Sequence, residues 1–193
     1  MTLRSEVAIA LVMPTLRHFP LFANSSPQLM SRVCGVCTTM SCAPTDVVVD
    51  AGTINQSIFF VVIGEMAALQ EVERDLKLVA RYPISAWFRE INLFVPEVLQ
   101  NMYVSTKFSE LLEIVQPKFA KMLDEFPKMK ASYTSIQARI SAGDRSALAP
   151  RPAVIHDGEP SISQSWVQTS VKKIRSSFGV DGSSPLQRSI RKH

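Results

Sequence analysis

Apolar residues recur at helical spacing at the start of the chain. Their spacing predicts a helix over residues 3–19, which Pro14 ends or bends before the helix restarts. Ser26, as the N-cap, and Pro27, at the first helical position, predict a second helix over residues 28–37. The chain therefore opens with a pair of helices.

From residue 38 the hydrophobic pattern takes the short period of strands. Runs of β-branched and aromatic residues, separated by turn residues, predict six to eight short strands, which favours a roll or barrel. The strands are expected at residues 38–43, 47–49, 57–63, 65–70, 77–81, 102–105 and 109–115, the last two as a hairpin. Residues 84–95 are expected to be irregular, with a helical turn.

Helical spacing returns after the strands. Pro117 begins one predicted helix, and Pro127 separates it from a second amphipathic helix over residues 129–140. Gly143 suits the position just past the end of that helix, because it can take the left-handed backbone found there.

The last part of the chain differs in composition. Residues 145–193 are rich in Ser and Pro and hold 8 Lys and Arg against 3 Asp and Glu, whereas residues 1–144 hold 13 against 14. We expect a basic, mostly disordered tail, either solvated or in contact with an anionic membrane surface. Within it, residues 165–178 have apolar residues at helical spacing, with Lys172, Lys173 and Arg175 opposite them, so this stretch is a candidate short helix.

Composition excludes several classes of protein. Of 193 residues, 46% are hydrophobic and 20% are charged, which are globular values, and no apolar run approaches the ~18 residues that span a bilayer. The sequence contains no Ser-His-Asp order, Walker loop or metal-ligand cluster, so we expect no enzyme activity. No helix-turn-helix is evident, so we expect no nucleic-acid partner, although a basic tail is one feature that could contact nucleic acid.

Three cysteines lie close together in the sequence. Cys34 and Cys37 have the spacing of half a zinc or redox site, but the chain offers no second Cys pair or His pair to complete four ligands. We therefore interpret them, together with Cys42, as free, partly buried thiols in a reducing compartment.

Three short motifs occur in order between the first and last predicted helices. They are Leu3-Arg4-Ser5-Glu6, Phe19-Pro20-Leu21-Phe22 and Phe119-Ala120-Lys121-Met122-Leu123-Asp124-Glu125-Phe126-Pro127. With the order of helices and strands, they make residues 3–141 resemble the cyclic-nucleotide-binding domain family. Within it, the chain is most similar to the cytosolic C-terminal region of eukaryotic cyclic-nucleotide-gated, hyperpolarization-activated and ether-à-go-go-type voltage-gated cation channels.

The resemblance implies an α+β fold, in which an antiparallel β-roll of the jelly-roll type is flanked by helices at both ends. Residues 1–20 would be the end of the channel linker, residues 21–144 the cyclic-nucleotide-binding-like domain and residues 145–193 the tail. It also implies a place on the cytoplasmic face of a membrane, next to an upstream pore, in a tetramer of subunits.

The resemblance implies a nucleotide pocket as well. The family holds a cyclic phosphate with a Phe-Gly-Glu segment at the start of a short helix and with Arg-Thr about ten residues later. Here the segment is Phe88-Arg89-Glu90, followed by Ile91, and Gln100-Asn101 stands at the position of Arg-Thr. Glu90 keeps the ribose acceptor, Arg89 crowds a glycine position, and Gln100 supplies no positive charge.

These departures leave alternatives open. Arg89 is a candidate substitute cation, Glu90 a candidate turn cap, and Gly52 and Gly64 are either pocket residues or turn glycines without a ligand role. The candidate pocket comprises Gly52, Gly64, Phe88, Arg89, Glu90, Ile91, Gln100 and Asn101. We expect a degenerate pocket that needs no cofactor and binds cyclic AMP or cyclic GMP weakly.

Three functions follow in order of preference. The first is a regulatory domain of a voltage-gated, potassium-type cation channel, which acts in gating or assembly. The second is a working cyclic AMP or cyclic GMP sensor. The third is a scaffold module that reaches a membrane or a partner through the basic tail.

Overall fold

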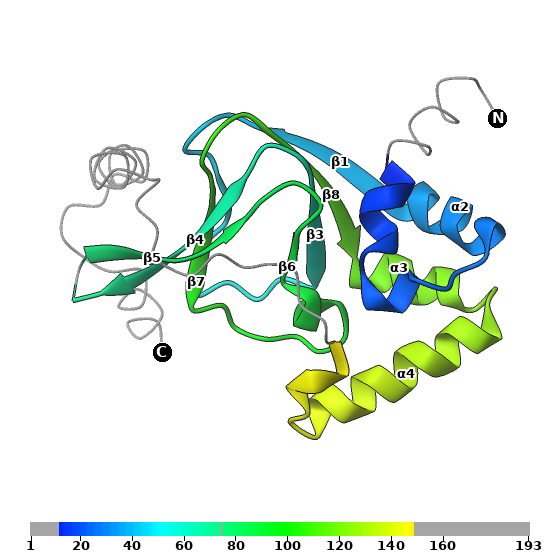
Figure 1. Cartoon of the computed structure of the whole chain (residues 1–193). Coiled ribbons are helices and arrows are strands. Elements are labelled where there is room, and N and C mark those ends of the chain that lie inside the picture. Colours follow the sequence, from blue (N-terminus) through cyan, green and yellow to red (C-terminus); the bar gives the residue numbers. More distant parts are fainter. Residues whose placement is uncertain (1–11, 74, 149–193) are drawn as a thin grey trace.

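The computed structural model describes residues 12–73 and 75–148, and its eight described strands form two four-stranded antiparallel sheets (Figure 1). The strands are β1 (Cys37–Cys42), β2 (Val47–Val49), β3 (Ser57–Ile63), β4 (Met66–Val72), β5 (Asp75–Tyr82), β6 (Trp87–Phe88), β7 (Asn101–Ser105) and β8 (Ser109–Val115). Sheet A has the order β1-β8-β3-β6 and sheet B the order β2-β7-β4-β5. The α+β fold with an antiparallel roll is therefore confirmed.

Helices lie at both ends of the roll, as the sequence predicts. They are η1 (Pro20–Phe22) and α2 (Pro27–Val36) before the strands, and α3 (Gln116–Leu123), α4 (Pro127–Ser141) and η3 (Arg145–Leu148) after them. One short helix, η2 (Glu90–Leu93), lies between β6 and β7. Ser26 caps α2 by accepting a hydrogen bond from the amide of Leu29 at 3.2 Å. Gly143 follows α4 with φ +89, the left-handed backbone expected of a residue past a helix end.

The predicted hairpin of residues 102–105 and 109–115 is wrong. β7 pairs with β2 and β4 in sheet B, whereas β8 pairs with β1 and β3 in sheet A. The three residues between them cross from one sheet to the other, and the crossing is held by a hydrogen bond of 2.9 Å from Ser105 Oγ to Ser109 Oγ. Sequence alternation identifies a strand but not its partner.

Two smaller expectations also change. Residues 12–17 are helical through Pro14, so the helix neither ends nor restarts there in the part that the structure describes. The stretch expected to be irregular contains β6, which pairs Phe88 with Phe59 of β3. A two-residue strand is too short to show a period of its own.

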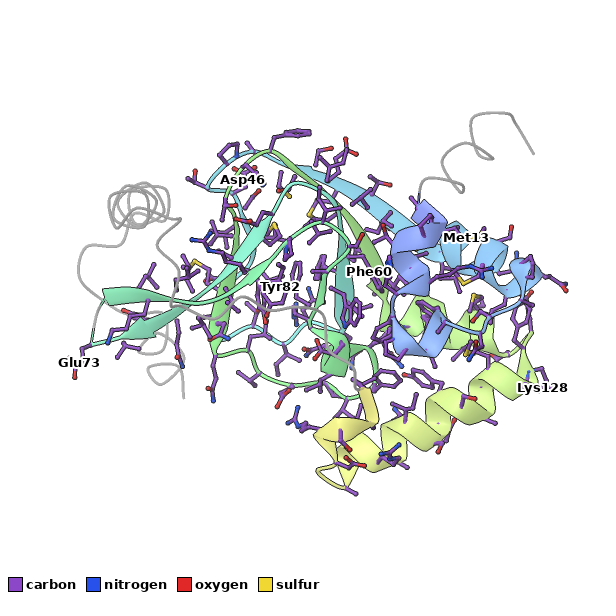
Figure 2. All side chains as sticks on the ribbon, viewed as in Figure 1. Met13, Asp46, Phe60, Glu73, Tyr82 and Lys128 are labelled. Carbon is purple, nitrogen blue, oxygen red and sulfur yellow. The ribbon has the colours of Figure 1, made fainter. Side chains whose placement is uncertain are left out.

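Two apolar clusters hold the fold together. One lies between sheet A and the helices, where Phe19 packs edge-to-face on Phe22 and Trp87 with centroid separations of 5.5 Å in both pairs. The other lies between the two sheets, inside the roll. Figure 2 shows Phe60 on the helix side and Tyr82 within the roll. Packing continues to Leu148, which is buried against the first cluster.

Candidate functional site

The segment that resembles the nucleotide cassette forms a strand, a sharp turn and a short helix. Phe88 ends β6 and is fully buried, and Glu90 begins η2. Arg89, between them, has φ 65 and ψ 32, in the left-handed region that favours glycine. The backbone thus keeps the geometry of a glycine position although the residue is an arginine.

The side chain of Arg89 is buried inside the roll, with 4% of the residue exposed. Its Nη2 donates to the backbone oxygen of Asn55 at 2.8 Å, while Nε and Nη1 have no hydrogen-bond partner among the described residues. Burial lowers the pKa of this guanidinium, and the nearby Tyr103 and Glu113 raise it in part. A buried and incompletely paired cation therefore lies next to the cassette.

Aromatic rings fill the roll interior beside Arg89. Phe88 stacks on Phe59 at a centroid separation of 5.2 Å and on Tyr103 at 4.8 Å, and Tyr82 lies 5.3 Å from Phe88 and 5.9 Å from Tyr103. Burial raises the pKa of Tyr103, and Glu90 raises it further. The interior is packed with the protein's own rings rather than left open.

The other predicted pocket residues are spread over several places. Gln100 is exposed at a bend, and Asn101 begins β7 opposite Gln70. Ile91 is half-buried against the helix-side core. None of these three places a cation near Glu90.

The two candidate glycines occupy turns that lie apart. Gly52 has φ 78, and its amide donates to the backbone oxygen of Leu99 at 2.8 Å, so it lies near the segment that leads into β7. Gly64 follows β3 at the end of the strand away from Arg89, against Ser109 and Phe108. The structure places Gly52 near the Gln100-Asn101 segment, whereas Gly64 lies against Ser109 and Phe108.

Sequence patterns missed Tyr82, Tyr103, Asn55 and Glu113. Glu113 accepts a hydrogen bond from Ser57 Oγ at 2.8 Å on the inner side of sheet A. The alternation of β7 could have predicted that Tyr103 and Val104 point to opposite faces of the sheet. Asn55 could not have been predicted, because it contributes only its backbone oxygen, which every residue type has.

The closing helix contacts the cassette directly. Tyr133 Oη of α4 donates to the backbone oxygen of Leu93 at 2.8 Å, and Gln137 Nε2 donates to that of Phe94 at 2.7 Å. Beyond α4, Arg145 forms two hydrogen bonds with the carboxylate of Glu97, which lower the pKa of that carboxyl. α4 and η3 therefore hold η2 and the loop after it in one place.

An open groove of about 710 Å³ lies beside the cassette rather than in it. It is lined by β2, the loop that follows it and the junction of β8 with α3, and it includes Asn55 but neither Arg89 nor Glu90. The groove is therefore not the pocket that the resemblance implies.

The cysteines are free thiols, as expected. Burial raises the pKa of Cys37 to about 12, and it also raises those of Cys34 and Cys42. No group of three potential metal ligands occurs within residues 12–73 and 75–148. In the same residues, no helix combines the length and the apolar character of a membrane span.

The comparisons with known proteins fit this architecture. No protein-family model matches the chain. It is 24% identical over 134 residues to the potassium/sodium hyperpolarization-activated cyclic nucleotide-gated channel 3 of Homo sapiens, an alignment that covers 69% of this chain and 17% of the channel. The chain therefore spans about one-sixth of that curated relative's length.

Solved structures resemble it at low identity. The N-terminal domain of a transcriptional regulator from Streptomyces coelicolor A3(2) has a TM-score of 0.59 at 16% identity, covering 67% of this chain and 93% of that one. The C-linker/CNBHD of zELK channels, crystallized in the presence of cAMP, has a TM-score of 0.54 at 20% identity, covering 66% and 62%.

The fold is that of a cyclic-nucleotide-binding domain. At low identity, the chain is similar in sequence to part of a cation channel and similar in fold to the C-linker/CNBHD of zELK channels. The Leu3–Glu6 motif and residues 149–193 lie outside the described residues.

Proposed function

We propose that the chain is a regulatory domain of a voltage-gated, potassium-type cation channel, on the cytosolic face of the membrane, with a degenerate nucleotide pocket. It acts in gating or assembly without requiring a cyclic nucleotide. The fold, the low-identity relation to channel domains and the helices that contact the cassette support this function.

The observation that carries the proposal is the position of Arg89. A cyclic phosphate would have to approach the backbone where this side chain leaves the main chain, in a left-handed conformation suited to glycine. The guanidinium turns inward to Asn55 and is buried. Gln100, at the position that should supply the positive charge, is neutral and exposed.

The expected weakening follows from the missing charge pair. Loss of one partner of a buried charge pair costs on the order of 2–5 kcal/mol. That cost corresponds to roughly 30-fold to several-thousand-fold weaker binding. The stacked rings of Phe88 and Tyr103, with the tilted ring of Tyr82 beside them, also occupy the inner side of the roll.

A working cyclic-nucleotide sensor is the second candidate. The unpartnered Nε and Nη1 of Arg89 favour it, because an anion that reached them would satisfy a buried cation. Such binding would require the cassette to open, since both atoms are shielded from solvent in this conformation.

A chimeric channel tests the regulatory role. The nucleotide-binding region of a hyperpolarization-activated channel is replaced by this chain, and the half-activation voltage is measured with and without cyclic AMP. We expect current of normal density at the cell surface and no shift with cyclic AMP, because the domain transmits force without the ligand.

The parent channel, which should shift, is the positive control. A chimera that carries Arg89→Gly, Gln100→Arg and Asn101→Thr should regain part of the shift. A shift in the unmodified chimera would favour the sensor, and failure to assemble as surface tetramers would contradict the channel role.

A further inference from the structure

The large apolar side chains that water reaches gather at two places on the roll. Among the described residues, those that are between 46% and 66% exposed are Ile54, Ile63, Ile84, Val98 and Phe108. Single exposed apolar residues are normal on a protein surface, whereas groups of them mark places where other molecules bind. One of the two places is a loop, and the other is the rim of a groove.

The first group surrounds the loop that crosses from β7 to β8. Phe108 is in this loop, and Ile63 ends β3 next to it, since a Cβ on Gly64 would lie 2.4 Å from the backbone oxygen of Phe108. The amide of Ser85 donates to a backbone oxygen of β3 at 2.8 Å, which brings Ile84 beside the same strand. Three exposed apolar side chains therefore lie at one end of the roll.

Lys107 and Phe108, the crossover tip, are held at the backbone while their side chains are exposed. The backbone oxygen of Lys107 accepts hydrogen bonds from the hydroxyls of Ser105 and Ser109. The ammonium of Lys107 forms no ion pair with any described residue. The tip thus presents an aromatic ring and a cation in a fixed place, so little backbone freedom is lost when a partner covers them.

The second group lies on the rim of the open groove of about 710 Å³. Ile54 lines the groove and forms an isolated bridge with Val98. The same two chain segments are joined again by a hydrogen bond of 3.3 Å from the amide of Leu99 to the oxygen of Thr53. The rim is therefore fixed by backbone pairing, and the groove is formed before any partner arrives.

The lining of the groove combines an apolar surface with one negative charge. Its apolar side chains include those of Val48, Ile54, Val115 and Pro117. Asp50 is the one charged residue of the lining; it accepts a hydrogen bond from the amide of Ala51, and no described cation pairs with it. An occupant that matches this lining carries an apolar side chain next to a positive charge.

The crossover tip and the groove lie at opposite ends of β8. Phe108 directly precedes this strand, and Val115, which ends it, lines the groove. Figure 1 shows β8 running from the top of the view down to α3. Its seven residues span roughly 20 Å. The tip of a chain therefore lies too far from its own groove to fill it, but it can reach the groove of a second copy.

We propose that the crossover tip of one copy of this chain inserts Phe108 into the groove of a second copy, with Lys107 next to Asp50. The ring covers the apolar lining, and the ammonium pairs with a carboxylate that has no cation of its own. The contact joins two different surfaces, so it is head-to-tail, and a pair of copies keeps one unused tip and one unused groove. This contact does not depend on the proposed channel role.

Sedimentation equilibrium of the full chain tests the contact. The weight-average mass should rise above that of a single copy between about 10 µM and about 1 mM, because a contact of this small size is weak. Phe108→Ser, which removes the ring, and Ile54→Lys, which places a cation in the groove, should each weaken self-association at least about tenfold. Both positions are exposed, and thermal unfolding verifies that the variants remain folded.

Charge reversal tests the pairing of the tip with the groove. Lys107→Glu and Asp50→Lys should each weaken self-association, whereas both changes in one chain should restore it, because the pair forms again with its signs exchanged. Lys77→Glu and Glu71→Lys, on the β4–β5 hairpin, are the matched controls and should leave it unchanged. A double variant no stronger than the single ones would contradict the proposal.

Mixing two variants tests the head-to-tail geometry. Phe108→Ser keeps an intact groove and Ile54→Lys keeps an intact tip, so an equimolar mixture should form one-to-one dimers that grow no further. A mixture that stays monomeric would overturn the proposal. So would an unmodified chain that stays monomeric at about 1 mM, or self-association that neither variant weakens.

Discussion

The left-handed backbone at Arg89 shows how a single residue changes a site without changing the fold. Glycine takes that conformation at little cost, whereas a residue with a Cβ gives up about 1–2 kcal/mol. The structure retains it because the chain must turn from β6 into η2. The side chain then enters the roll and donates to Asn55, so a position that would admit a ligand is filled from within.

Gly64 is the residue whose replacement should damage the roll most selectively. A Cβ at this position would lie 2.7 Å from the Cα of Ser109 and would clash with Ser109 Oγ and the oxygen of Phe108. Gly64→Ala should lower the free energy of unfolding by about 3 kcal/mol or more.

Gly52→Ala is the control for backbone conformation alone, since Gly52 also has positive φ but no neighbour within 4 Å of a Cβ. It should cost about 1 kcal/mol. Urea unfolding measures both variants; equal losses would show that the clash at Gly64 does not matter.

Among the helices and strands, the sequence predicted the features that depend on local pattern. It missed the features that depend on which strands pair with one another. The start of α2 at Pro27 and the strand over residues 57–63 follow from local capping and alternation. The separation of β7 and β8 into different sheets follows from pairings with β2, β4, β1 and β3. The same holds for the candidate site. The order Phe88-Arg89-Glu90 could be read from the sequence, but the burial of Arg89 could not, because it depends on residues from other strands.

The contact between α4 and η2 is the element-level link that can be tested. Tyr133→Phe removes the donor to Leu93 and the acceptor for Gln116 Nε2, while the ring packing on Phe94 at a centroid separation of 5.0 Å remains. We expect a loss of about 1–2 kcal/mol in the free energy of unfolding, because the buried oxygen of Leu93 and the half-buried amide of Gln116 each lose a partner.

Ser132→Ala, at the exposed neighbouring position, should leave urea unfolding nearly unchanged. An unchanged midpoint in Tyr133→Phe would mean that packing alone joins α4 to η2.

The whole molecule has the fold of a cyclic-nucleotide-binding domain, and its closing helix α4 contacts the cassette. Tyr133 and Gln137 of α4 provide that contact, and Arg145 of η3 binds Glu97 in the loop that follows. Arg89 and aromatic side chains fill the roll interior beside the cassette. In such a domain, a ligand would have to displace Arg89 and compete with the stacked rings. Under the proposed channel role, regulation would then depend on how the domain is joined to the rest of the channel.

Titration calorimetry of cyclic AMP and cyclic GMP on the full chain tests this claim most directly. The unmodified chain should show no binding at micromolar concentration. The variant with Arg89→Gly, Gln100→Arg and Asn101→Thr should bind at least about tenfold more tightly, because it regains the backbone approach, the cation and the hydroxyl donor. Micromolar binding by the unmodified chain would contradict the account, as would a variant that gains nothing.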